Sequence, residues 1–193
     1  MRLALTIACL AFAPAALAGE ARYSPPGPQQ KTAFVAFDGM IGPGDADRLD
    51  TALQKAQGSG RQLAVTLGSS GGDFEEAMAM GRVIRRYEAD TYHAYCAAAC
   101  SFAFLGGARR FMLQDDAMTA LIVHRPPFAE ALLDRPNPSR ALRARLDVLR
   151  DYALEMTGDG RAYSFIMSFS SSSPHKVTEA EALEQKIITQ ALH

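Results

Sequence analysis

Hydrophobic residues recur along this chain in short runs separated by polar, glycine-containing turns. The runs at 32–37 and 62–67 have the length and the flanking turns of buried strands. Further strands are predicted at 91–95 and 119–123. Because segments with helical spacing lie between these runs, the pattern predicts an α/β domain with a mostly parallel sheet covered by helices.

Three helices are predicted between the strands. The first is expected to be capped by Asp45 and to bury one face, made of Leu49, Ala52, Leu53 and Ala56. The second begins near Phe74 and places its charged residues mainly on the opposite face. The third covers the small, apolar residues 97–105 and is expected to be buried.

Two further segments near the C-terminus have helical patterns. One is expected to start with Asn137 as its cap, and it carries the apolar stripe Leu142, Leu146, Leu149, Tyr152 and Met156. The other, residues 178–189, is predicted to be a short helix that runs into a strand.

The N-terminus has the pattern of an export signal. Arg2 precedes an apolar stretch that ends in the small-x-small sequence Ala16-Leu17-Ala18 before Gly19. We therefore expect residues 1–18 to be a cleaved signal peptide and the protein to be periplasmic or secreted, with no membrane span after cleavage. Residues 19–31, rich in proline and polar side chains, are expected to form a flexible lead-in to one domain over 32–193.

Charge and cysteine content argue against nucleic-acid and metal binding as functions of this chain. Loss of Arg2 from the 20 basic residues leaves 19 against 21 acidic ones, without a basic stripe, so no nucleic-acid partner is expected. Cys96 and Cys100 remain after cleavage, and in an oxidising compartment such a pair predicts a disulfide. Two sulfurs without a nearby histidine or further cysteine do not make a zinc site, so neither a metal nor a cofactor is expected.

The sequence TLGSSGGDF at 66–74 places a glycine turn between a predicted strand and a predicted helix. It lacks the spacing of dinucleotide and phosphate-binding loops, and Asp73 at the helix start would repel phosphate. Two interpretations stay open. Gly71 and Gly72 can serve a structural turn that needs positive φ or close packing, or their amides can form part of an oxyanion hole.

Three motifs taken in order resemble the Clp protease proteolytic-subunit and crotonase superfold. They are TLGSSGGDFEEAMAM, YCAAACSFAFLGGARRF and ALIVHRPP, and the resemblance, which covers about residues 32–190, is stronger to exported Clp-like bacterial proteins. It implies oxyanion amides at Gly71-Gly72, a nucleophile that opens a buried helix, and a base at His124. Depending on the register, the nucleophile position falls on Ala98, Cys100 or Ser101.

The resemblance is weakest where it concerns chemistry. The acidic third member of the triad would fall near Pro174, where SSSSPHK contains no carboxylate. A base without its orienting acid can lose about 10⁴ in rate. The triad is therefore degraded at best, and whether the chain is an enzyme is left open.

Three functions follow from these observations. The first is a catalytically silent module that binds a peptide or an acyl group in the inherited cleft. The second is a serine hydrolase or peptidase that uses Ser101 and His124 with the amides at Gly71-Gly72. The third is an assembly protein that forms a homo-oligomer through the 138–157 helix, because the resembled proteases pack subunits with the helix at this position.

Overall fold

The computed structural model describes residues 19–113, 119–133 and 139–191. Within these ranges seven strands form one mixed sheet, in the order β1-β2-β3-β4-β6-β7 with β5 beside β4. The strands are β1 (Glu20–Tyr23), β2 (Thr32–Asp38), β3 (Gln62–Ser69), β4 (Asp90–Ala97), β5 (Arg110–Phe111), β6 (Ala120–Val123) and β7 (His175–Lys176). Strands β2, β3, β4 and β6 are parallel, whereas β1 and β7 pair antiparallel at the two edges. The prediction of a mostly parallel α/β domain is confirmed.

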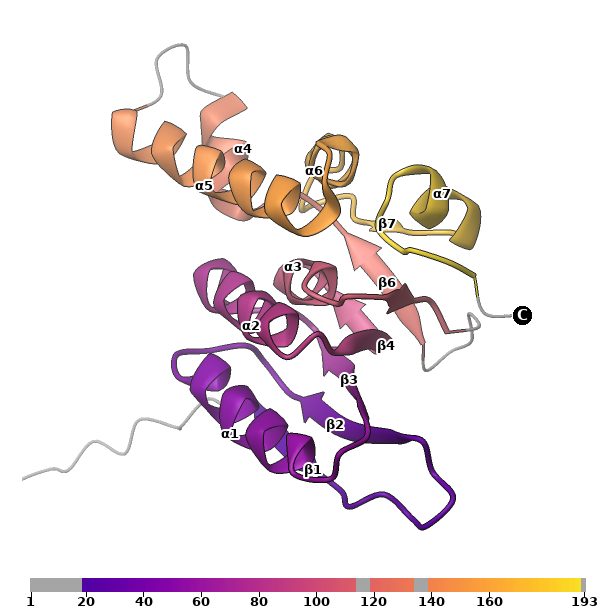
Figure 1. The fold of residues 1–193 in the computed structure, drawn as a ribbon. Coiled ribbons are helices and arrows are strands. Elements are labelled where there is room, and N and C mark those ends of the chain that lie inside the picture. The colour runs from indigo at the N-terminus through magenta and orange to yellow at the C-terminus, as the bar shows by residue number, and fades with distance from the viewer. Residues whose placement is uncertain (1–18, 114–118, 134–138, 192–193) are drawn as a thin grey trace, which may run out of the picture.

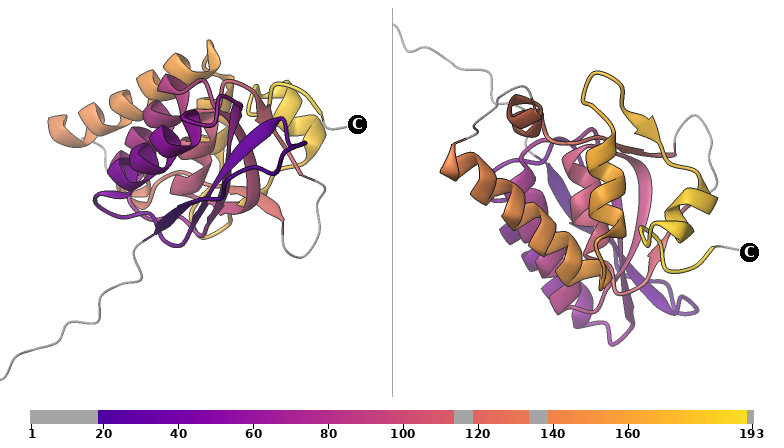
Figure 2. Two further views of the ribbon diagram at one scale, coloured as in Figure 1. Left: turned by 60° about the horizontal axis from the view of Figure 1, so that its bottom comes forward. Right: turned by 90° about the horizontal axis from the view of Figure 1, so that it is seen from above.

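Seven helices accompany the sheet in the described residues. They are α1 (Asp45–Gln57), α2 (Phe74–Arg86), α3 (Ala99–Leu105), α4 (Pro127–Leu133), α5 (Arg140–Thr157), α6 (Arg161–Ser168) and α7 (Glu179–Glu184). Figure 1 shows α1, α2 and α3 side by side along one face of the strands, with α5 and α6 continuing the row. The view from above in Figure 2 shows that the outer half of α5 extends beyond the sheet. None of the described helices is both long and apolar enough to cross a membrane.

The core forms where the predicted apolar runs meet the helices. Ala33, Val35 and Phe37 alternate inward from β2 and are fully buried, as period-two spacing requires. Tyr152 of α5 is also fully buried, and its hydroxyl donates a 2.7 Å hydrogen bond to the carbonyl oxygen of Phe102. Burial raises the pKa of this hydroxyl and keeps it protonated. These contacts fix α3, which is buried along its whole length, between α2 and α5.

Several local predictions are corrected by the structure. Part of the predicted flexible lead-in, residues 20–23, is β1, because its backbone pairs with β2 from Tyr23 opposite Val35 to Glu20 opposite Asp38. The N-cap of α1 is Gly44, and Asp45 is instead a buried first-turn residue. Ser139 caps α5 by accepting a hydrogen bond from the amide of Leu142, while Asn137 lies outside the described residues.

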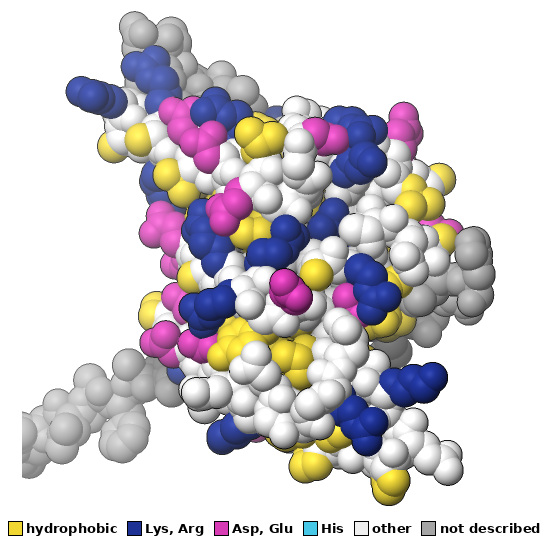
Figure 3. Space-filling view, viewed as in Figure 1, with side chains coloured by type: hydrophobic (Ala, Val, Ile, Leu, Met, Phe, Trp, Pro, Cys, Tyr) yellow, Lys and Arg dark blue, Asp and Glu magenta, His cyan; other side chains and the backbone are white. Residues whose placement is uncertain are grey.

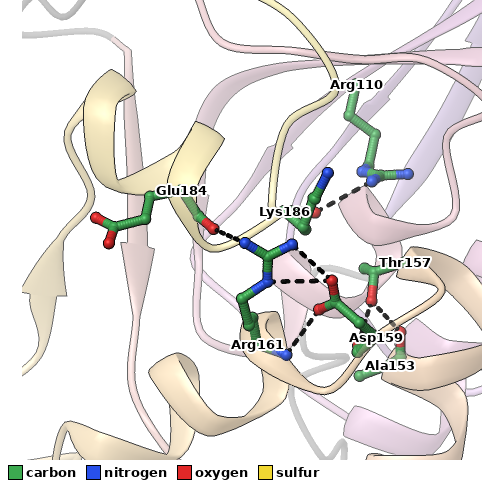
Figure 4. A network of polar contacts seen from close by, with 7 residues as sticks. All are labelled: Arg110, Ala153, Thr157, Asp159, Arg161, Glu184 and Lys186. Atoms are coloured by element: carbon green, nitrogen blue, oxygen red, sulfur yellow. Dashed lines mark hydrogen bonds and ion pairs between the residues drawn. The ribbon is translucent and has the colours of Figure 1, made fainter.

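No strand follows α7 in the described chain. Ile187 and Ile188 are buried there, but their segment is held by Arg110 instead of by a ladder. The Arg110 guanidinium donates to the carbonyl oxygens of Ile187 and Lys186, and burial lowers its pKa to about 10. Figure 4 shows further hydrogen bonds that hold this segment. Arg161 donates both to Asp159 and to the carbonyl oxygen of Glu184.

Candidate functional site

Three adjacent parallel strands end at one edge of the sheet and bring the predicted site residues to that edge. Cys96 of β4 pairs with Ser69 near the end of β3, and Ala97 pairs with Ile122 of β6. The glycine turn follows β3, Ala98 follows β4 and His124 follows β6. The carboxyl edge of a parallel sheet is where ligand sites of α/β proteins are built.

The two glycines of the turn have different surroundings. Gly71 is buried with φ 113°, and a Cβ added there would lie 2.9 Å from the Cβ of Ala98. Gly72 is exposed with φ 136°, and an added Cβ would overlap the carbonyl group of Ile41. Glycine is therefore needed at both positions. Gly71 packs closely against the β4–α3 turn, and Gly72 packs closely against the segment after β2.

The amides of this turn are not equivalent either. The N–H of Gly71 donates to the hydroxyl oxygen of Ser69 at 3.1 Å, so it is occupied by the turn itself. The N–H of Gly72 donates to no other residue in the part of the chain that the structure describes. Of the two predicted oxyanion donors, only Gly72 thus has a main-chain N–H left for a ligand.

Ala98 has the unusual backbone conformation of the site. Its φ of 52° and ψ of −119° lie outside the regions that L-residues favour, and it sits between the end of β4 and the start of α3. Its amide donates to the carbonyl oxygen of Ile122 at 3.0 Å. A strained residue on a sharp strand-to-helix turn is the geometry that exposes the nucleophile in hydrolases of the α/β class. In this chain that position carries only a methyl group.

The other two candidate nucleophiles are engaged in internal bonds. Cys100 forms a disulfide with Cys96, at a Cα–Cα distance of 5.3 Å, which confirms the predicted pairing. The Ser101 side chain is buried, and its hydroxyl donates a 2.7 Å hydrogen bond to the carbonyl oxygen of Ala98. This is the common back-bonding of a helical serine to a preceding carbonyl.

His124 is half-buried at the end of β6. Its Nδ1 lies 2.8 Å from the carbonyl oxygen of Arg125, so an N–H at Nδ1 would donate there and leave Nε2 as the acceptor. No carboxylate contacts the His124 ring among the described residues. A carbonyl oxygen can fix the tautomer of an imidazole, but it lacks the negative charge that stabilises the imidazolium in a triad.

The carboxylate near His124 belongs to a separate clamp that the sequence did not reveal. Glu130 of α4 accepts from Arg125 at 2.8 Å and from the backbone N–H of Ser171 at 2.7 Å. The Ser171 amide and the Arg125 guanidinium hold the pKa of Glu130 below its usual value. This clamp fastens the serine-rich segment after α6 to the turn that carries His124.

A second histidine lies where the missing acid was sought. His175 of β7 pairs with Val123 of β6 and lies 3.0 Å from both carboxylate oxygens of Glu181. The Phe169 ring stacks on the His175 ring with centroids 4.2 Å apart. The Glu181 carboxylate therefore contacts His175 and Thr178 at the start of α7, and it does not contact His124. No spacing in the sequence indicates this pair.

No group of three or more His, Cys, Asp or Glu side chains in the described ranges is arranged to hold a metal ion. In comparisons with known proteins, no family model and no curated protein matches the chain.

Proposed function

We propose that this protein is an exported, Clp/crotonase-like domain that binds a peptide or an acyl group without cleaving it. The single observation that carries the proposal is the methyl side chain of Ala98 on the strained β4–α3 turn. That turn has the shape of a nucleophile elbow, and it lacks a nucleophile.

A bound peptide or acyl conjugate has two partners at this edge: the Gly72 N–H can donate to its carbonyl oxygen, and Nε2 of His124, the acceptor side of the ring, can accept from its N–H or O–H. The N–H of Gly72 is a main-chain donor on an exposed turn, and Nε2 of His124 is the free side of a half-buried ring. Peptides and acyl conjugates supply carbonyl oxygens together with N–H or O–H donors, which makes them the ligand class that this pair fits.

The hydrolase alternative uses Ser101 and His124. It requires the Ser101 hydroxyl to leave the carbonyl oxygen of Ala98 and to become exposed, and it requires a carboxylate for His124. The disulfide between Cys96 and Cys100 ties the helix that carries Ser101 to β4, which opposes such a movement. For this reason we rank binding above catalysis.

Assembly through α5 is a second candidate with an observation of its own. Val148 and Leu154 on this helix are 50% and 47% exposed. A groove of about 390 Å³ lies between α2, α4 and α5, and Phe74, Met78 and Phe128 form much of its wall. Figure 3 shows hydrophobic side chains interspersed with charged ones along α5. Size measurement of the wild type and of Val148→Glu tests this candidate, with Lys55→Glu on α1 as the control.

Binding is tested with a library of fluorescent acylated peptides, measured by polarisation against the folded protein. The proposal expects at least one peptide class to bind, with affinity reduced about tenfold or more in His124→Ala. The intended control is Lys55→Ala, on an exposed face of α1. Peptide turnover by the wild type, lost in Ser101→Ala, would favour the hydrolase; failure of every peptide to bind would remove the proposal.

A further inference from the structure

Gly19, the first described residue, enters the domain against two fully buried side chains. A Cβ added to Gly19 would overlap the ring of Phe37 and lie 3.0 Å from Oδ2 of Asp45. Phe37 and Asp45 both have an exposed fraction of 0%, and Gly19 itself is buried. Gly19 thus lies beside a buried carboxylate, at a position that only glycine can occupy without displacing Phe37.

The Asp45 carboxylate has room for one more donor. Its Oδ1 accepts from the Arg48 guanidinium at 2.6 and 2.9 Å, and its Oδ2 accepts from the backbone N–H of Gly42 at 2.7 Å. An ionised carboxylate can accept about four hydrogen bonds. Covalent geometry places the backbone nitrogen of Gly19 within roughly 5.5 Å of Oδ2, a range in which opposite charges interact strongly.

The predicted signal-peptide cleavage falls between Ala18 and Gly19. Hydrolysis of that peptide bond by an export-associated peptidase consumes one water, leaving a carboxylate on Ala18 and an amino group on Gly19. The new amino group takes up a proton and becomes a cation at neutral pH. We propose that this α-ammonium group pairs with the buried Asp45 carboxylate, so that removal of the leader adds a second cation to the carboxylate that Arg48 already pairs with.

The ion pair would act on the segment that supports the glycine turn. Asp45 holds the amide of Gly42, and the neighbouring Ile41 both donates to the carbonyl oxygen of Gly71 at 2.8 Å and accepts from the amide of Asp73 at 3.0 Å. In Figure 1 the segment between β2 and α1 passes close to the start of α1. Cleavage is therefore expected to stabilise the backbone contacts that hold Gly71 and Gly72. This inference rests on the predicted leader and not on the proposed binding function.

The first test uses the full chain, expressed with its own leader and isolated after export. Intact mass and N-terminal sequencing are expected to give a protein that starts at Gly19.

The second measurement is the rate at which a mild acetylating reagent modifies the α-amino group, in the folded protein and in urea. Because the reagent needs the neutral amine, an ion pair that raises the pKa of the ammonium group should slow the folded reaction about tenfold. Asp45→Asn should abolish this protection, and Asp47→Asn, which alters an exposed carboxylate in the same first turn of α1, should leave it unchanged.

A second variant keeps Asp45 intact in case Asp45→Asn does not fold. Insertion of one alanine after Ala18 moves the new amino group by about 3.8 Å and is expected to lower the unfolding temperature by about 5 °C. A mature N-terminus elsewhere, or an uncleaved chain, would overturn the inference. So would equal acetylation rates in the folded and unfolded protein, or an inserted alanine that leaves the unfolding temperature unchanged.

Discussion

The hydroxyl of Ser101 donates a hydrogen bond to the carbonyl oxygen of Ala98, the residue that occupies the strained turn before α3. The serine among the candidate nucleophiles therefore supports the backbone of the turn that holds Ala98. This relationship gives Ser101 a structural role.

Replacement of Ser101 by alanine should lower the free energy of unfolding by about 1 kcal/mol, because one buried hydrogen bond is lost. Peptide affinity should stay unchanged. Urea unfolding followed by circular dichroism measures the first effect. Ser168→Ala is the matched control, since Ser168 makes the same kind of bond to Phe165 at an exposed position and should cost less.

The disulfide between Cys96 and Cys100 encloses the same turn. Replacing both cysteines by alanine should destabilise the protein by about 2 kcal/mol, the chain-entropy value for so short a loop. Urea unfolding of the double variant and of the wild type measures the difference. Intact mass after alkylation, with and without prior reduction, checks that the wild type is oxidised. A double variant as stable as the wild type would contradict a structural role for the bridge.

Gly71 should tolerate alanine poorly. The added methyl would press on Ala98 in a conformation with φ 113°, so we expect a loss of about 2–4 kcal/mol. Gly158→Ala is the control, because Gly158 has φ 78° but nothing within 4 Å of an added Cβ, and it should lose only about 1 kcal/mol. Thermal unfolding of both variants separates close packing from backbone conformation. Equal losses would mean that Gly71 is needed for its φ angle alone.

The Glu181 carboxylate should make stability depend on acid pH. The Thr178 backbone N–H, His175 and the Thr178 hydroxyl lower its pKa to about 2. A carboxylate whose pKa is lower in the folded state stabilises the protein above its unfolded pKa, and this contribution disappears as pH falls toward the folded value. The urea midpoint of the wild type should therefore exceed that of Glu181→Gln at pH 7, and the gap should shrink at pH 3. Glu179→Gln, in the same first turn, should show no such narrowing.

The sequence predicted much of the fold, because most strands and helices bury one regular face. The runs at 32–37 and 62–67 and the stripe that includes Leu149 and Tyr152 correspond to β2, β3 and α5. Two segments without a regular apolar face were missed. The short edge strand β1 has little apolar pattern, and the segment after α7 is fixed by Arg110, a distant residue in sequence.

The sequence predicted which segments form the candidate site, but not which residue takes the nucleophile position. Three positions, 98, 100 and 101, could have carried the nucleophile, and the positive φ of Ala98 shows that position 98 occupies the sharp turn between β4 and α3. The Arg125–Glu130 clamp and the His175–Glu181 pair were invisible in sequence, because each depends on how α4, α6 and α7 dock. Such contacts have no fixed spacing that a pattern can report.

The most direct test of the central claim is covalent labelling with a fluorophosphonate probe at neutral pH. We expect that the wild type is not labelled. Ala98→Ser should gain labelling that maps to position 98 by peptide mass spectrometry and falls when His124 is also replaced by alanine. Labelling of the wild type that disappears in Ser101→Ala would contradict the account, because Ser101 would then be a working nucleophile.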